Sequence, residues 1–202
     1  AKYISSVEEA TAPLGITPHN FEENLEELKE FNPMIGMRGC RLGITYPEIT
    51  QMQAEAIFEA AKEVSKEKNV KIFPYIMIPN VAFKDEFLNQ KTIIDAVAKK
   101  FGFDLEHYQV GTMIETPRAA LLSKDLAEAG AQFFSFGTND LTQLTTGMSR
   151  DDYGKFSELY LKFRIFPEGD PFQILDQKGV GKLIFESVLA GRSVNPKIKI
   201  GI

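Results

Sequence analysis

The sequence predicts an α/β fold, namely a partial (β/α)8 TIM-type barrel that is truncated at both ends. Short apolar runs alternate with longer segments of helical periodicity along most of the chain. The apolar runs are continuous, which is typical of parallel strands that are covered by helices. No G-x-G-x-x-G fingerprint follows a first strand, so a dinucleotide-binding doubly wound sheet is less favoured. A complete barrel needs roughly 250 residues and eight strands, whereas four strands are clear in these 202 residues.

The first 31 residues are predicted to form a helical segment that leads into the barrel domain, which we assign to residues 32–202. The stretch FEENLEELKEF carries apolar residues at helical spacing: Phe21, Leu25, Leu28 and Phe31. Residues 32–45 are rich in glycine and are predicted to be irregular.

Helices and strands are then predicted to alternate. The helices are expected at 46–68, 85–102, 117–130 and 170–192, and a further one begins near LTQLTT. The strands are expected at 71–79, 108–115, 131–137 and 197–202. Pro47 suits a first helical turn, whereas Pro74 counts against the strand in which it falls.

Composition excludes several classes of function. The net charge of −5 and the pI near 5.2 argue against a nucleic-acid-binding or anionic-membrane-binding surface. The single cysteine, Cys40, excludes an internal disulfide bond and fits a reducing compartment. No secretory signal and no apolar run of about 20 residues is present. We therefore expect a soluble, cytoplasmic protein.

Polar residues follow two of the predicted strands at the point where each ends. Strand 108–115 ends in Glu115, and strand 131–137 is followed by Thr138, Asn139 and Asp140. The carboxyl ends of parallel strands meet at one rim, where ligands gather. Two carboxylates with water and substrate oxygens form a common Mg²⁺ site. Gly137 would let the backbone approach a ligand closely.

Each of these residues also has a purely structural interpretation. Asp140 could cap a helix, and Glu115 could be a surface residue before a proline-initiated helix. Arg38 lies between glycines and offers a planar fork for phosphate or carboxylate, or is a solvated turn residue. Arg150 alone would be a loop charge, and a packed, inert thiol is the favoured interpretation of Cys40. The occurrence of both carboxylates on adjacent strand ends favours a functional site.

Four motifs together carry a resemblance to a known family, and it extends from about residue 31 to the end. They are NPMIGMRGCRLGITYPEI, GTMIETPRAAL, FFSFGTNDLTQLTTGMSRDD and DPFQILDQKGVG. The chain closely resembles the C-terminal barrel domain of the pyruvate, phosphate dikinases. The wider family includes phosphoenolpyruvate (PEP) synthase and enzyme I of the bacterial sugar phosphotransferase system, but the RGCRLG and SRDD forms resemble the dikinases.

The resemblance implies roles for the matched positions. Glu115 and Asp140 match the acidic pair that binds Mg²⁺ (or Mn²⁺), which is bridged to PEP. Arg38 and Asn139 match catalytic residues that contact the phosphoryl group. Arg150 matches an arginine that contacts the phosphate in the enzyme I branch.

The resemblance further places the Gly137 and Thr138 backbone near the substrate carboxylate. It implies that the full enzyme interconverts ATP, phosphate and pyruvate with AMP, diphosphate and PEP. The expected partners are PEP or pyruvate, a phosphohistidine domain of the same protein, and a second copy in a homodimer.

Two parts of the family pattern lie outside the 202 residues. One is a CGEHGG-type segment with the cysteine that acts as general acid, and the other is an RTEHMF-type segment with a further phosphate-binding arginine. We therefore expect the chain to be inactive alone. PEP synthase, an enzyme I-type domain, a metal-dependent 2-oxoacid lyase barrel and a non-catalytic scaffold remain the alternatives.

Overall fold

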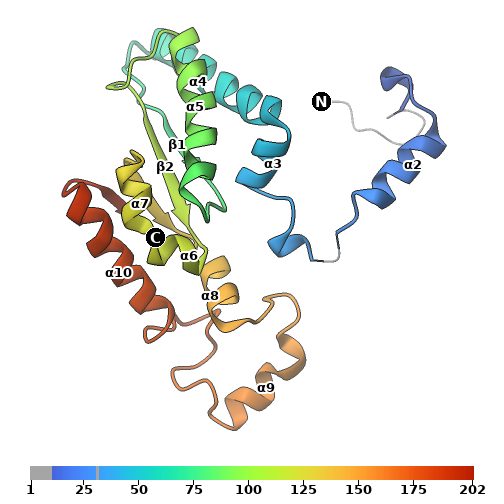
Figure 1. Ribbon diagram of the computed structural model, residues 1–202, viewed down its shortest axis with the longest axis vertical. Coiled ribbons are helices and arrows are strands. Elements are labelled where there is room, and N and C mark those ends of the chain that lie inside the picture. The colour runs from blue at the N-terminus through green and yellow to red at the C-terminus, as the bar shows by residue number, and fades with distance from the viewer. Residues whose placement is uncertain (1–10, 31) are drawn as a thin grey trace. The chain divides into compact units, whose positions relative to one another are not determined.

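The structure is a computed structural model that describes residues 11–30 and 32–202. The chain divides into two compact units between Met37 and Arg38 (Figure 1). Part of the predicted helical segment 1–31 lies outside the described residues, and its boundary at residue 31 stays a prediction.

In the first unit the main element is helix α2 (Pro18–Glu27). The hydroxyl oxygen of Thr17 accepts a hydrogen bond from the main-chain N–H of Asn20 at 3.2 Å, and Pro18 occupies the first helical position. These two features fix the helix start. Two 3-10 turns, η1 (Ala12–Leu14) and η2 (Pro33–Ile35), flank α2 in the sequence.

The second unit is built on one parallel sheet of four strands in the order β1-β2-β3-β4. The strands are β1 (Tyr75–Ile78), β2 (Gln109–Ile114), β3 (Phe133–Phe136) and β4 (Lys199–Gly201). The register places Ile76 opposite Val110, Thr112 opposite Phe134, and Phe134 opposite Ile200. The predicted α/β fold with a parallel sheet is confirmed. The sheet formed by the described residues is open, because β1 and β4 do not pair.

Helices cover one face of this sheet (Figure 1). They are α3 (Cys40–Thr45), α4 (Pro47–Lys68), α5 (Lys84–Lys100), α6 (Pro117–Leu121), α7 (Ser123–Glu128), α8 (Thr138–Thr146) and α10 (Val180–Val194), whereas α9 (Gly154–Lys162) lies away from the sheet. Helix α4 packs on α5, α5 on α7, and α7 on α10. The strands are parallel and lie in sequence order. Crossover connections of one hand therefore place the connecting helices on the same face, where they form one layer, as in one arc of a βα barrel.

Burial along the strands alternates between the two faces of the sheet. Ile76, Val110 and Phe134 are buried on the helix-covered face. On the other face, Tyr75 remains 46% exposed and Met77 41% exposed. The sequence pattern of continuous apolar residues nevertheless predicts burial on both sides of such strands.

Four elements differ from the sequence-based prediction. Residues 40–45, predicted to be irregular, form helix α3, and the predicted helix 117–130 is interrupted at Leu122, whose φ of −111° is not helical. Helix α9 was not predicted. The last helix begins at Val180, ten residues later than expected, because Asp170 and Asp176 accept hydrogen bonds from main-chain N–H groups two and three residues ahead and so form turns.

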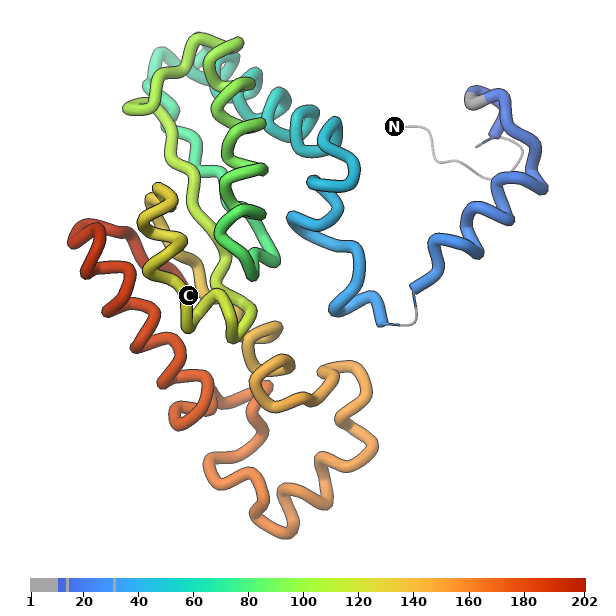
Figure 2. The backbone as a smooth tube through the Cα atoms, in the orientation of Figure 1, coloured from blue at the N-terminus to red at the C-terminus, as the bar shows by residue number. Residues whose placement is uncertain are grey.

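The segment 147–179 leaves the sheet between α8 and α10 and carries α9 (Figure 2). Aromatic pairs hold it together, with ring centroids 4.6 Å apart for Tyr153–Phe172 and 5.1 Å apart for Tyr160–Phe166. Within the described part of the chain, no helix is both long and apolar enough to cross a membrane.

Candidate active site

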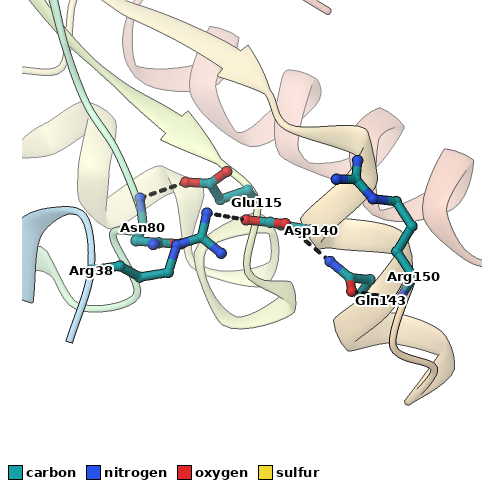
Figure 3. A network of polar contacts seen from close by, with 6 residues as sticks. All are labelled: Arg38, Asn80, Glu115, Asp140, Gln143 and Arg150. Carbon is teal, nitrogen blue, oxygen red and sulfur yellow. Dashed lines mark hydrogen bonds and ion pairs between the residues drawn. The ribbon is translucent and has the colours of Figure 1, made fainter. Parts of the chain in front are cut away.

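Polar side chains gather at the carboxyl edge of the sheet, and three come from strand ends or the turns beyond them (Figure 3). Asn80 follows β1, Glu115 follows β2 directly, and Asp140 lies just beyond β3 in helix α8. Arg38 reaches the same place from the segment before α3. The predicted meeting of the two carboxylates at one rim is thus observed.

Glu115 is almost fully buried, with 4% of its surface exposed. Its Oε1 accepts a hydrogen bond of 2.6 Å from the main-chain N–H of Asn80, whose φ of 57° is in the left-handed region that asparagine tolerates. Burial is the main cause that raises the pKa of Glu115; the Asn80 bond lowers this pKa, Asp140 raises it and Arg38 lowers it. A negative charge is therefore costly here, and a bound cation would relieve that cost.

Gly137 makes room for this carboxylate. A Cβ atom at Gly137 would lie 2.6 Å from Oε2 and 2.8 Å from Cβ of Glu115. Gly137 has an ordinary φ of −82°, so the requirement for glycine is one of space and not of backbone conformation.

We expect Gly137→Ala to displace Glu115 and to weaken Mn²⁺ binding about tenfold, with a stability loss of about 1–3 kcal/mol from overpacking. Mn²⁺ titration followed by electron paramagnetic resonance and thermal unfolding would measure both effects. Gly154→Ala is the matched control, because nothing lies within 4 Å of a Cβ at Gly154. Unchanged Mn²⁺ affinity in Gly137→Ala would show that the space beside Glu115 is unimportant for the site.

Asp140 lies in the first turn of α8, whose N-cap is Gly137, so the interpretation of Asp140 as an N-cap is wrong. Its Oδ2 pairs with Nη2 of Arg38 at 2.8 Å, and its Oδ1 accepts a hydrogen bond of 3.1 Å from Nε2 of Gln143. The side chain of Asp140 is 16% exposed and that of Arg38 is 37% exposed. The ion pair is therefore partly buried and is only partly screened by solvent.

The site has the chemistry of a hard-cation site. Its anionic donors are the carboxylate oxygens of Glu115 and Asp140, which suit Mg²⁺ when water and substrate oxygens complete the coordination. No group of three or more His, Cys, Asp or Glu side chains suited to a metal occurs among the described residues. A cation here would therefore depend on non-protein ligands, as Mg²⁺ at phosphate-transfer sites does.

The other predicted site residues lie beside this cluster. Arg150 is exposed, and its main-chain N–H donates to Oε1 of Gln143 at 2.7 Å. Thr138 and Asn139 line a small neighbouring pocket together with Phe172. The structure thus brings Arg38, Glu115 and Asp140 together, and places Thr138 and Asn139 at an adjacent pocket.

Two residues of this network were not identified from the sequence, Asn80 and Gln143. Asn80 follows Pro79 at the end of a strand, where Asn is a common turn residue and does not indicate a functional role. Gln143 lies three residues after Asp140 on a helix, a spacing at which Gln and Asp side chains meet. The three-residue spacing of Asp140 and Gln143 could have identified Gln143 once α8 was assigned to residues 138–146.

Two nearby residues have structural roles. Cys40 is buried, its Sγ donates to the carbonyl oxygen of Asn80 at 3.4 Å, and burial raises its pKa to about 12. The interpretation of Cys40 as a packed thiol is thereby supported. Arg118 donates to the carbonyl oxygen of Ala82 and lies 4.0 Å from the ring centroid of Phe83, so it stabilises the loop after β1.

Comparison with known proteins gives consistent similarities. A family model described as "PEP-utilising enzyme, PEP-binding domain" matches residues 13–198. The chain is 52% identical over 200 residues to the chloroplastic pyruvate, phosphate dikinase of Mesembryanthemum crystallinum, covering 97% of this chain and 21% of that protein. It is 49% identical over 209 residues to the pyruvate, phosphate dikinase of Clostridium symbiosum, covering 100% of this chain and 24% of that protein. The chain thus spans about a fifth to a quarter of the length of these relatives.

Proposed function

The chain belongs to the PEP-binding-domain family of PEP-utilising enzymes, and from this premise we propose that it forms the PEP- and pyruvate-binding part of a pyruvate, phosphate dikinase. The complete enzyme would convert ATP, phosphate and pyruvate into AMP, diphosphate and PEP. The observation that carries this proposal is the convergence of Arg38, Glu115 and Asp140 at one sheet edge, in a chain about 50% identical to dikinases.

Glu115 and Asp140 would hold Mg²⁺, with Mn²⁺ as a substitute. Their oxygen donors fit a hard cation, and a bound cation would offset the burial that raises the pKa of Glu115. When bound, the cation would act as a Lewis acid for the oxygen on which enolate charge develops.

Arg38 would bind the transferred phosphoryl group through its planar fork. Charge spreads over the phosphoryl oxygens during transfer, so a fixed guanidinium lowers the barrier by stabilising that charge. Asn139 would reach the same group from α8. The backbone of Gly137 and Thr138 would lie near the substrate carboxylate, and Arg150 would contribute a further positive charge.

The phosphoryl group would pass between PEP and a histidine on another domain of the same full-length protein. The open sheet is proposed to be one arc of a (β/α)8 barrel, because the strands are parallel and sequential and the helices form one layer. Under this proposal residues 32–202 belong to the barrel domain and residues 1–31 lead into it. We further propose a homodimeric, cytoplasmic enzyme.

The test is an assay of the complete protein for AMP and diphosphate formation from ATP and pyruvate, with and without phosphate. A dikinase requires phosphate and forms diphosphate. Release of free phosphate from ATP, with no phosphate requirement, would instead identify a PEP synthase. Failure to form PEP under either condition would contradict both assignments and favour a lyase or a non-catalytic role.

A further inference from the structure

We propose that Gln143 is a positioning residue of this site, which fixes the carboxylate of Asp140 and the turn carrying Arg150 through a single side-chain amide. The amide spans the two groups: Nε2 donates to Oδ1 of Asp140 at 3.1 Å, and Oε1 accepts from the main-chain N–H of Arg150 at 2.7 Å (Figure 3). This inference rests on the proposed function and deepens it.

An amide suits this position, because it donates at one end and accepts at the other. Gln143 is 7% exposed, so an unpaired end would not be compensated by water. Residues Leu141 and Thr142 of the same helix are also buried, which anchors α8 beneath the site. The amide is therefore held at a fixed place in the fold.

The bond to Oδ1 decides which oxygen of Asp140 is presented to the site. Oδ2 faces the guanidinium of Arg38, while Oδ1 is bound by the amide. A carboxylate that is held through both oxygens has a fixed plane, and this is what orients a metal ligand. Without Gln143, the Asp140 side chain could rotate and lose its alignment with Glu115 and Arg38.

The bond to Arg150 attaches the 147–153 turn to the same carboxylate. Arg150 lies seven residues from Gln143, beyond the end of α8 at Thr146, so no helical hydrogen bond fixes its position. The amide of Gln143 instead fixes the backbone of Arg150, and with it the position from which the Arg150 side chain extends. Gln143 thereby connects a proposed metal ligand with a proposed phosphate-contacting arginine.

The first test compares Gln143→Met with Gln90→Met in the complete enzyme. Methionine keeps the volume but leaves both partners of Gln143 unpaired. We expect the pyruvate half-reaction to fall about tenfold in kcat and the spectrum of bound Mn²⁺, recorded with pyruvate and without nucleotide, to change. Phosphorylation of the histidine by ATP should not change.

Gln90 is the matched control, because it is 3% exposed and bonded at both ends, to Thr50 at 2.6 Å and to Asn89 at 3.0 Å. Gln90→Met should lower thermal stability to a similar extent but leave kcat and the Mn²⁺ spectrum unaltered. If Gln143→Met also lowers only thermal stability, the positioning role is wrong. The proposed function would still stand in that case, since it depends on Glu115 and Asp140.

A double-mutant cycle with Arg150→Ala tests the second contact. Alanine removes the guanidinium but keeps the main-chain N–H that donates a hydrogen bond to Oε1 of Gln143. If Gln143 acts partly by placing Arg150, Gln143→Met will cost less activity in the Arg150→Ala background than in the unchanged protein. Equal costs in both backgrounds would overturn the proposed connection to Arg150.

Discussion

In the complete enzyme, Glu115→Gln or Asp140→Asn is expected to reduce the pyruvate half-reaction by about 10³-fold or more, because cation stabilisation of the enolate supplies several kcal/mol. Either change keeps the side-chain shape but removes one of the two anionic donors. Phosphorylation of the histidine by ATP should proceed at its normal rate, since under the proposed function that half-reaction takes place on other domains. Isotope exchange between pyruvate and PEP, and labelling from ATP, measure the two halves separately.

The control for this experiment is Glu55→Gln, because Glu55 on α4 pairs with Lys100 at the end of α5 at 2.8 Å and takes no part in the hydrogen bonds of the site. It should leave both half-reactions intact. Loss of both half-reactions in Glu115→Gln would point to a folding defect. Normal pyruvate exchange in Glu115→Gln would refute the assignment of the metal site.

Replacement of Arg38 is expected to have opposite effects on cation binding and on chemistry. In the structure the guanidinium of Arg38 pairs with Oδ2 of Asp140 at 2.8 Å, so it competes for an oxygen that a metal would use. Arg38→Ala should therefore bind Mn²⁺ alone about threefold to tenfold more tightly, which corresponds to about 1 kcal/mol for a partly exposed ion pair. Phosphoryl transfer to or from PEP should fall by about 10³-fold.

Tighter Mn²⁺ binding together with slower phosphoryl transfer would distinguish a phosphate-binding role of Arg38 from a structural one. If Arg38 only stabilised the fold, its removal would weaken cation binding together with activity. Arg41→Ala is the control, since Arg41 lies three residues away in the same GMRGCR stretch, and it should alter neither quantity strongly. Mn²⁺ titration and single-turnover phosphoryl transfer provide the two readouts.

Much of the fold could be predicted because its elements have strong local signals. The 22-residue helix α4 carries a proline at its first position and an apolar stripe, and it was found almost to the residue. The parallel sheet followed from continuous apolar runs such as that of β3. The break at Leu122 and the late start of α10 could not be predicted, because they depend on packing and on turns formed by Asp170 and Asp176.

The candidate site was predictable where topology alone determines proximity. Glu115 and Asp140 follow adjacent parallel strands, so they had to lie near one edge. The partners of these carboxylates were not predictable in the same way. Asn80 contributes a main-chain N–H, which any residue type could supply, and the contact between Arg38 and Asp140 joins positions 102 residues apart.

The most direct measurement is a crystal structure of the complete protein with Mn²⁺ and pyruvate, in which anomalous scattering locates the metal. The account predicts one Mn²⁺ bound by a carboxylate oxygen of Glu115 and one of Asp140, with Arg38 moved away from Asp140. An Mn²⁺ bound to pyruvate elsewhere, with Arg38 still paired to Asp140, would contradict it.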